Sequence, residues 1–128
     1  MDRDYTRRIL GCVYNVYYEM GPGLLESVYE EALKMELESQ GFHVDNQVQV
    51  PVYYKNVKLK TTLRLDLIID RKVILELKSV KEYNKVFEKQ LYTYLRLMNC
   101  ELGYVINFNV NRFRDGIHTV YNEIDSKN

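Results

Sequence analysis

Residues 64–80 read RLDLIIDRKVILELKSV, and this stretch decides the fold. On either side of a short polar break, odd positions are aliphatic, whereas Asp66, Glu76 and Lys78 stand at even positions. Alternation with period two is typical of half-buried strands that each have one apolar face. The break at residues 70–72 is short enough for a hairpin loop. The stretch therefore predicts an antiparallel hairpin that gathers its charges on one face.

The length of the loop sets which residues face each other across this hairpin. A two-residue loop would place Asp66 opposite an apolar residue, and a one-residue slip moves every side chain to the other face. A three-residue loop at 70–72 keeps the faces separate, and we predict it for that reason. The resulting pairs are Leu67 with Leu75, Leu65 with Leu77, and Asp66 with Glu76.

This register places two carboxylates opposite each other, with Lys78 on the same face. Directly opposed residues have Cβ atoms about 5 Å apart, where like charges repel. A hard divalent cation such as Mg²⁺ is held by one or two carboxylates and otherwise by water and phosphate oxygens, so it would relieve this repulsion. A solvated sheet face of mixed charge, with no function, is the alternative interpretation.

Composition sets further bounds on the protein. The chain has 128 residues, from which we expect one domain spanning residues 1–128. Its 18 basic and 18 acidic residues balance, so net charge indicates no partner. Between Lys55 and Lys89, however, basic residues outnumber acidic ones about two to one. This segment fits a phosphate backbone, although a solvated basic face is the commoner explanation.

Cysteine usage and hydropathy indicate the compartment. Cys12 and Cys100 stand in apolar helical contexts, which predicts buried thiols in a reducing compartment. The two isolated histidines provide no zinc constellation. We find no signal peptide and no apolar run near the ~20 residues of a membrane span. We therefore expect a soluble cytoplasmic protein that does not contact membranes.

Periodicity along the chain predicts eight elements in the order α-α-β-β-β-α-β-β, which is a mixed central sheet flanked by helices. Helices are expected over 3–19, over 24–40 and after Val80, and strands over 44–54, 57–69, 73–80, 104–110 and 117–124, with fraying from Ser126. Pro51 suggests that its strand lies at a sheet edge. The second helix is expected to bury Leu25, Val28, Ala32, Leu33 and Met35 or Leu37.

Glu26, in the first turn of this second helix, has two interpretations. A carboxylate at that position interacts favourably with the helix dipole, and this interaction alone explains its presence. It also shares a helix face with Tyr29 and Glu30, three and four residues away. The residues alone leave both interpretations open.

Several motifs occur together in an order that resembles a known family. GPGLLESVY at 21–29 carries Gly-x-x-Glu-x-x-Tyr, and Asp66, Glu76-x-Lys78, Gln90-x-x-x-Tyr94 and the INFN stretch at 106–109 follow it. Over residues 5–121 the chain is similar to the GxxExxY proteins, a small prokaryotic family of the PD-(D/E)XK nuclease superfamily. It departs from that family's frequent pattern at Tyr17 and Phe87, where a histidine is common.

The resemblance implies a restriction-endonuclease-like α/β core that uses Mg²⁺ or Mn²⁺ to hydrolyse phosphodiester bonds. Carried over by position, Asp66 and Glu76 would be metal ligands, and Glu26 would approach the same metal through a water molecule. Lys78 would orient the attacking water and offset charge on the phosphate. Gln90 and Tyr94 would border the site.

Two functions follow as hypotheses. The first is an Mg²⁺-dependent nuclease acting on DNA or RNA. The second is a nuclease-like binding module that holds nucleic acid or a protein partner without cutting. A homodimer built from the tyrosine-rich surfaces is compatible with either, since the chain has 12 tyrosines. Those tyrosines otherwise reflect compositional bias, with stacking on bases as a lesser alternative.

Overall fold

The computed structural model describes residues 1–124. The elements in chain order are α1 (Arg3–Met20), α2 (Glu26–Ser39), β1 (Val44–Tyr54), β2 (Val57–Ile69), β3 (Val73–Lys78), α3 (Val86–Met98), β4 (Leu102–Asn107), the short 3-10 helix η1 (Phe113–Gly116) and β5 (Ile117–Tyr121). The five strands form one sheet in the order β1-β2-β3-β4-β5. Only β3 and β4 run parallel among these neighbours. The predicted α/β class, element order and mixed sheet are confirmed.

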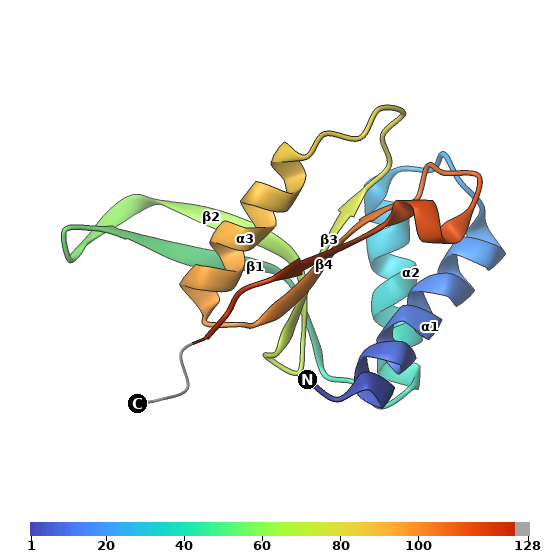
Figure 1. The fold of residues 1–128 in the computed structure, drawn as a ribbon, viewed down its shortest axis with the longest axis horizontal. Coiled ribbons are helices and arrows are strands. Elements are labelled where there is room, and N and C mark those ends of the chain that lie inside the picture. The colour runs from blue at the N-terminus through green and yellow to red at the C-terminus, as the bar shows by residue number, and fades with distance from the viewer. Residues whose placement is uncertain (125–128) are drawn as a thin grey trace.

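Helices cover both faces of the sheet (Figure 1). On one face, α1 and α2 bury residues such as Val13 and Leu33 against Leu75 and Leu77 of β3. On the other face, α3 buries Leu91 and Leu95 against a second apolar cluster. Because the central strands are covered on both sides, β3 and β4 are apolar at nearly every position.

The buried face of α2 differs from the predicted one. Leu25 and Met35 are 74% and 67% exposed, whereas Tyr29, Leu33 and Leu37 are fully buried. The Tyr29 ring stacks on Phe108 with centroids 4.0 Å apart. Leu33 is buried as predicted, Leu37 rather than Met35 is the buried one of that pair, and Leu25 lies just before the helix as its N-cap residue. The prediction of an inward Leu25 was therefore wrong, although the helix itself is present.

The two hairpins agree with the sequence patterns. Residues 70–72 form the loop between β2 and β3, with Leu67 opposite Leu75 as predicted. Its left-handed residues, Asp70 and Arg71, have φ of +53° and +58°. The Asp70 carboxylate accepts hydrogen bonds from the Tyr5 hydroxyl at 2.7 Å and the His43 amide at 2.9 Å, which fixes the loop against α1. In the other hairpin, β1 is an edge strand, as Pro51 suggested, and its register with β2 shifts between Pro51 and Tyr53.

The C-terminal strands are shorter than expected. The strand predicted over 104–110 occupies Leu102–Asn107 and is buried on both faces rather than on one. β5 lies at the other edge of the sheet and ends at Tyr121. The predicted fraying from Ser126 concerns residues outside the described range. Cys12 and Cys100 are buried free thiols, as expected. Among residues 1–124, none of the helices has the length and apolar character needed to span a membrane.

Candidate active site

The candidate site lies where β2 and β3 separate. Their ladder pairs Ile69 with Val73 and Leu67 with Leu75, and then stops. Beyond that point, the carboxylates of Asp66 and Glu76 take the place of backbone carbonyls as hydrogen-bond acceptors between the two strands. The Asp66 amide donates to Oε2 of Glu76 at 2.7 Å, and the Leu77 amide donates to Oδ2 of Asp66 at 2.8 Å. The predicted juxtaposition of Asp66 and Glu76 is therefore present, held by side chain to backbone hydrogen bonds.

The predicted pair of Leu65 with Leu77 does not form. Leu77 packs with α1 and α2, whereas Leu65 packs in the cluster under α3. β1 has a kink beside this point, where Gln47 has a φ of +52°. Gln47 and Asp66 are also absent from the residue pairs of the β1–β2 ladder. The kink and the carboxylate hydrogen bonds together redirect β2 at Asp66, so strict alternation does not continue through it.

The carboxylate pair lies in a desolvated position. Glu76 is 8% exposed, and Asp66 is half-buried. Burial, together with the charge of Asp66, raises the pKa of Glu76 to about 8. Burial is also the main cause that raises the pKa of Asp66, and the charges of Glu30 and Glu26 add to it. The pair therefore holds a proton to higher pH than free carboxylates do.

Lys78 lies beside the pair, but its ammonium group is held elsewhere. Its charge lowers the pKa values of Asp66 and Glu76, which opposes the effect of burial. Lys78 Nζ stands 4.4 Å from the centroid of the Phe87 ring on α3, a cation–π contact. Phe87 is one of the positions where the resembling family often has a histidine, and here its ring positions the lysine.

Tyr17, the other departure, has a structural role. Its hydroxyl donates to the Val110 carbonyl at 2.6 Å, and its ring packs against Phe113. These contacts tie α1 to the segment before η1, on the side of the sheet opposite α3.

The Gly-x-x-Glu-x-x-Tyr motif forms one local structure that presents Glu26. Gly23 adopts φ of +88°, a conformation that favours glycine, in the turn before α2. The Tyr29 hydroxyl closes this turn by accepting from the Leu24 amide and donating to the Gly21 carbonyl. Glu26 is the first residue of α2, and its Oε2 accepts from the Ser79 amide at 3.2 Å. The exposed Glu26 thus contacts the segment directly after Lys78.

Glu26 does not complete a ligand cluster with the carboxylate pair. Within residues 1–124, no group of three or more His, Cys, Asp and Glu side chains is close enough to hold a metal ion. Glu26 is near enough for its charge to affect Asp66, but it contacts Ser79. Its predicted approach through a water molecule remains a prediction.

The two α3 residues differ in their relation to the pair. Tyr94 is half-buried, and burial together with the charges of Glu76 and Asp66 raises the pKa of its hydroxyl. Gln90 is exposed one turn earlier, and no hydrogen bond from the described residues engages its side chain. Of these two residues, Tyr94 is the one whose pKa responds to the charges of the pair.

Asn107 belongs to the INFN stretch at 106–109, but no role was predicted for it. It is 4% exposed and lies opposite Lys78 in the β3–β4 ladder. Its amide oxygen accepts from the Val80 amide at 3.0 Å and its nitrogen donates to the Val80 carbonyl at 3.1 Å. These bonds position the segment that leaves Lys78. The signal was a lone asparagine within an apolar strand, since a buried polar side chain needs partners.

The donor set fits a divalent cation bound by oxygen. Each carboxylate uses one oxygen on a backbone amide, and within residues 1–124 no donor engages Oδ1 of Asp66 or Oε1 of Glu76. Because no buried side-chain nitrogen or oxygen of the described residues lacks a hydrogen-bond partner, these two oxygens are not fully buried. Two carboxylate oxygens with water and phosphate oxygens match the preference of Mg²⁺.

Comparison with known proteins agrees with this geometry. A search of curated proteins found no match. A model described as the PD-(D/E)XK nuclease superfamily matches residues 3–120, which include both carboxylates, Lys78, strands β1 to β4 and all of β5 except its last residue, Tyr121. The order Asp66, Glu76-x-Lys78 on adjacent strands is the arrangement after which that superfamily is named. The chain belongs to the PD-(D/E)XK nuclease superfamily.

Proposed function

We propose that this protein is a nuclease that uses Mg²⁺ or Mn²⁺ to hydrolyse phosphodiester bonds of DNA or RNA. The observation that carries the proposal is the Asp66–Glu76 pair. Each carboxylate accepts a hydrogen bond from a backbone amide of the other strand, and its second oxygen is not fully buried. In this proposal Asp66 and Glu76 bind the cation, and Glu26 contacts it through a water molecule. Superfamily membership supports nuclease chemistry for the same residues.

The residues divide the chemistry among them. A bound divalent cation would lower the pKa of the attacking water and screen the phosphate. The Lys78 ammonium offsets the negative charge that develops on the phosphate and orients the water. In this proposal the ammonium leaves the Phe87 ring and turns toward the phosphate when the substrate binds. Tyr94 and Gln90 border the substrate on the α3 side.

We further propose, from the Gly23, Glu26 and Tyr29 motif, that the chain is a GxxExxY protein of prokaryotic type with one nuclease-like domain over residues 1–128. The structure of the motif supports this proposal, because each of the three residues has its own role. Gly23 adopts the positive φ of the turn, the Tyr29 hydroxyl closes the turn, and Glu26 accepts from the Ser79 amide. A cytoplasmic location is proposed with it, in keeping with the two free thiols. We keep the homodimer as a hypothesis, which sedimentation analysis would test.

A nuclease-like binding module is the second candidate function. The contact between Lys78 and Phe87 favours it, because the ammonium group forms no ion pair with a carboxylate of the described residues. Such a protein would bind nucleic acid, or a protein partner, without cutting.

Cleavage assays separate the two functions. Plasmid DNA, single-stranded DNA and RNA are incubated with Mn²⁺, Mg²⁺ or EDTA. The nuclease predicts metal-dependent cleavage that Asp66→Ala, Glu76→Ala and Lys78→Ala each abolish. The losses are expected to be strongly non-additive because the three residues act as a unit. Variants that cut as well as the parent would assign the activity to another site or to a contaminant.

A further inference from the structure

The hairpin between β1 and β2 extends away from the rest of the molecule (Figure 1). β3 pairs with β2 only through residues 67–69, so beyond them the hairpin is a two-stranded ribbon. We name residues 51–64 the arm. All arm residues except Val52 and Leu63 are exposed. The Lys55–Asn56 turn at its tip has φ of +49° and +65°, which suits a tight two-residue hairpin.

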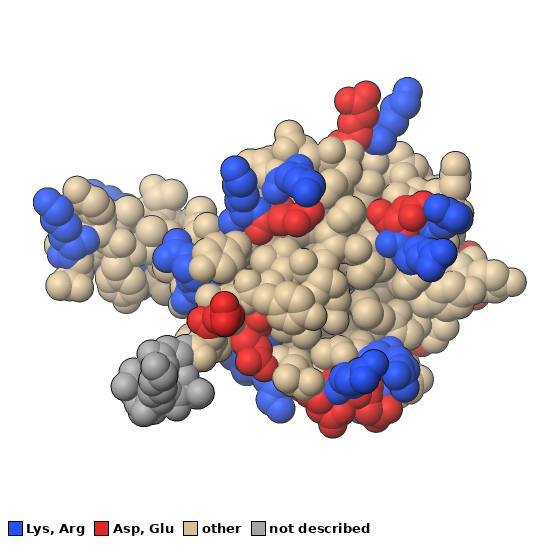
Figure 2. Space-filling view, viewed as in Figure 1, with Lys and Arg blue, Asp and Glu red and all other residues tan. Residues whose placement is uncertain are grey.

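The charge of the arm has one sign. Residues 46–65 contain four basic residues and no aspartate or glutamate. The basic residues are Lys55, Lys58, Lys60 and Arg64. Figure 2 shows the same arrangement, since the projecting lobe carries basic groups and no acidic group on the visible face. The whole chain, in contrast, has equal numbers of acidic and basic residues.

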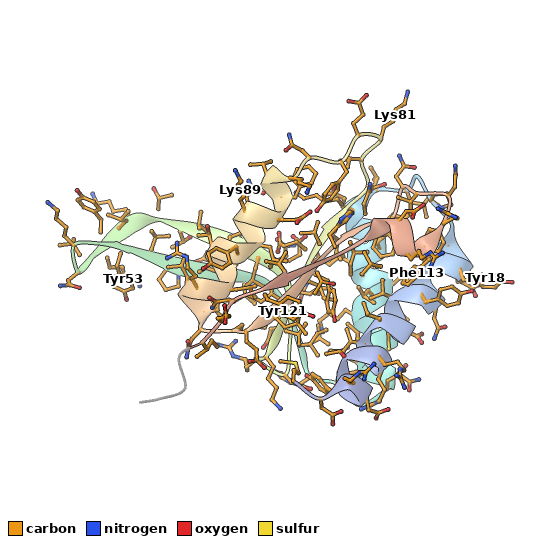
Figure 3. All side chains as sticks on the ribbon, in the orientation of Figure 1. Tyr18, Tyr53, Lys81, Lys89, Phe113 and Tyr121 are labelled. Atoms are coloured by element: carbon orange, nitrogen blue, oxygen red, sulfur yellow. The ribbon has the colours of Figure 1, made fainter. Side chains whose placement is uncertain are left out.

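Two exposed tyrosines stand beside these basic groups near the tip. Tyr53 and Tyr54 are 57% and 63% exposed, and Tyr53 lies opposite Lys58 in the ladder. Figure 3 shows the Tyr53 side chain on the ribbon, away from the core. Exposed aromatic rings next to lysines are a surface on which nucleic-acid bases stack and phosphates bind.

The arm leads directly to the carboxylate pair. Arg64 is two residues before Asp66 on β2. From Asp66 to Lys58 the strand rises about 26 Å at roughly 3.3 Å per residue. That length matches about eight nucleotides at 3.4 Å per nucleotide of one strand. The arm is therefore long enough for a phosphodiester chain bound along it to reach the proposed cleavage position.

We propose that the arm binds the nucleic-acid backbone and guides it to the site at Asp66 and Glu76. The proposal rests on the proposed nuclease or binding function, which it deepens by naming the surface. A two-stranded ribbon also has the width that the major groove of a duplex admits. A second copy of this chain fits less well, because pairing two arms would bring like charges together.

The test compares two variants of equal charge change. The arm variant carries Lys55→Gln, Lys58→Gln and Lys60→Gln. The control carries Arg3→Gln, Arg7→Gln and Arg114→Gln, three exposed residues outside the arm and the site. Fluorescence anisotropy in EDTA measures binding to labelled 30-mers of duplex DNA, single-stranded DNA and duplex RNA, so cleavage does not enter. Thermal melts check that both variants fold.

The arm variant is expected to lose about 10- to 100-fold in affinity for at least one probe at about 100 mM salt, and its log–log salt slope is expected to fall by about 2 to 3. The control is expected to lose less than about 3-fold. The most affected probe identifies the nucleic acid.

Three results would overturn the proposal: no binding by the parent, equal losses in both variants, or a parent dimer that the arm variant dissociates with its nucleic-acid binding unchanged. Absence of cleavage would refute the nuclease alone, since arm-dependent binding in EDTA would persist.

Discussion

Replacement of Asp66 by Asn distinguishes a metal site from a structural charged face. The pKa of Glu76 is about 8 in the fold against an ordinary value of 4.5, so ionising Glu76 costs the fold about 5 kcal/mol at 1.36 kcal/mol per pKa unit. Burial is the largest cause of this raised pKa, and the charge of Asp66 is the second. Two charges about 5 Å apart at an effective dielectric constant of 20 repel by roughly 3 kcal/mol, which limits what the substitution can relieve.

Asp66→Asn keeps an acceptor oxygen for the Leu77 amide and removes this repulsion. We therefore expect it to stabilise the metal-free protein by about 1–3 kcal/mol at pH 8, which raises Tm by roughly 4–12 °C for a domain of this size. The gain depends on pH. Because the folded pKa of Glu76 is raised, the stability from its neutral form is complete below about 4.5 and is lost as pH rises through about 8. The variant and the parent should thus melt together near pH 4.5 and diverge toward pH 8.

Divalent ions supply the second comparison. Since the metal binds only the folded site, Mn²⁺ at 100 times its dissociation constant should stabilise the parent by about 2.7 kcal/mol, and Asp66→Asn should lose this response. Thermal melts of both proteins at pH 4.5 and 8, with and without millimolar Mn²⁺, measure all of these differences. A parent indifferent to Mn²⁺, together with a destabilised Asp66→Asn, would refute the metal site and indicate a structural charged face.

Two further substitutions test residues around the pair. Glu26→Gln should weaken Mn²⁺ binding in calorimetric titration while lowering stability by less than about 1 kcal/mol, and unchanged affinity with unchanged activity would leave Glu26 as a helix-dipole residue. Phe87→Leu keeps an apolar side chain against the α3 cluster but removes the cation–π contact, worth about 0.5–2 kcal/mol, so Lys78 should move toward the carboxylates. The pH profile of Mn²⁺ binding should then shift to lower pH because Glu76 deprotonates more easily; an unshifted profile would mean that Phe87 does not position Lys78.

The hairpin at residues 70–72 could be predicted from sequence because its loop length and its apolar alternation had a single consistent solution near the turn. The same alternation failed at Leu65, four residues farther from the loop than Ile69. There the Gln47 kink and the two carboxylate hydrogen bonds change the direction of β2. Neither feature has a signature in strand periodicity, because both depend on which strand lies alongside.

The sequence predicted which residue types form the site better than it predicted their contacts. Asp66 and Glu76 meet because both are strand residues of one hairpin, which is local information. Phe87 and Asn107 act on the segment around Lys78 through contacts between elements, and sequence spacing does not reveal such contacts. Tyr29 shows the same limit, since its helix face was assigned from leucines, whereas the stacking partner Phe108 lies directly after β4, 79 residues later.

The arrangement of charge at the site argues for a bound partner more than for a structural role. A face stabilised by its own ion pairs would place the Lys78 ammonium between the two carboxylates. Here the ammonium lies over the Phe87 ring, and backbone amides take one oxygen of each carboxylate. Glu76 therefore keeps a raised pKa that costs stability, as groups at functional sites commonly do. A cation at the second oxygen of each carboxylate would neutralise the pair, and a phosphate beside it would give the lysine a stronger partner than an aromatic ring.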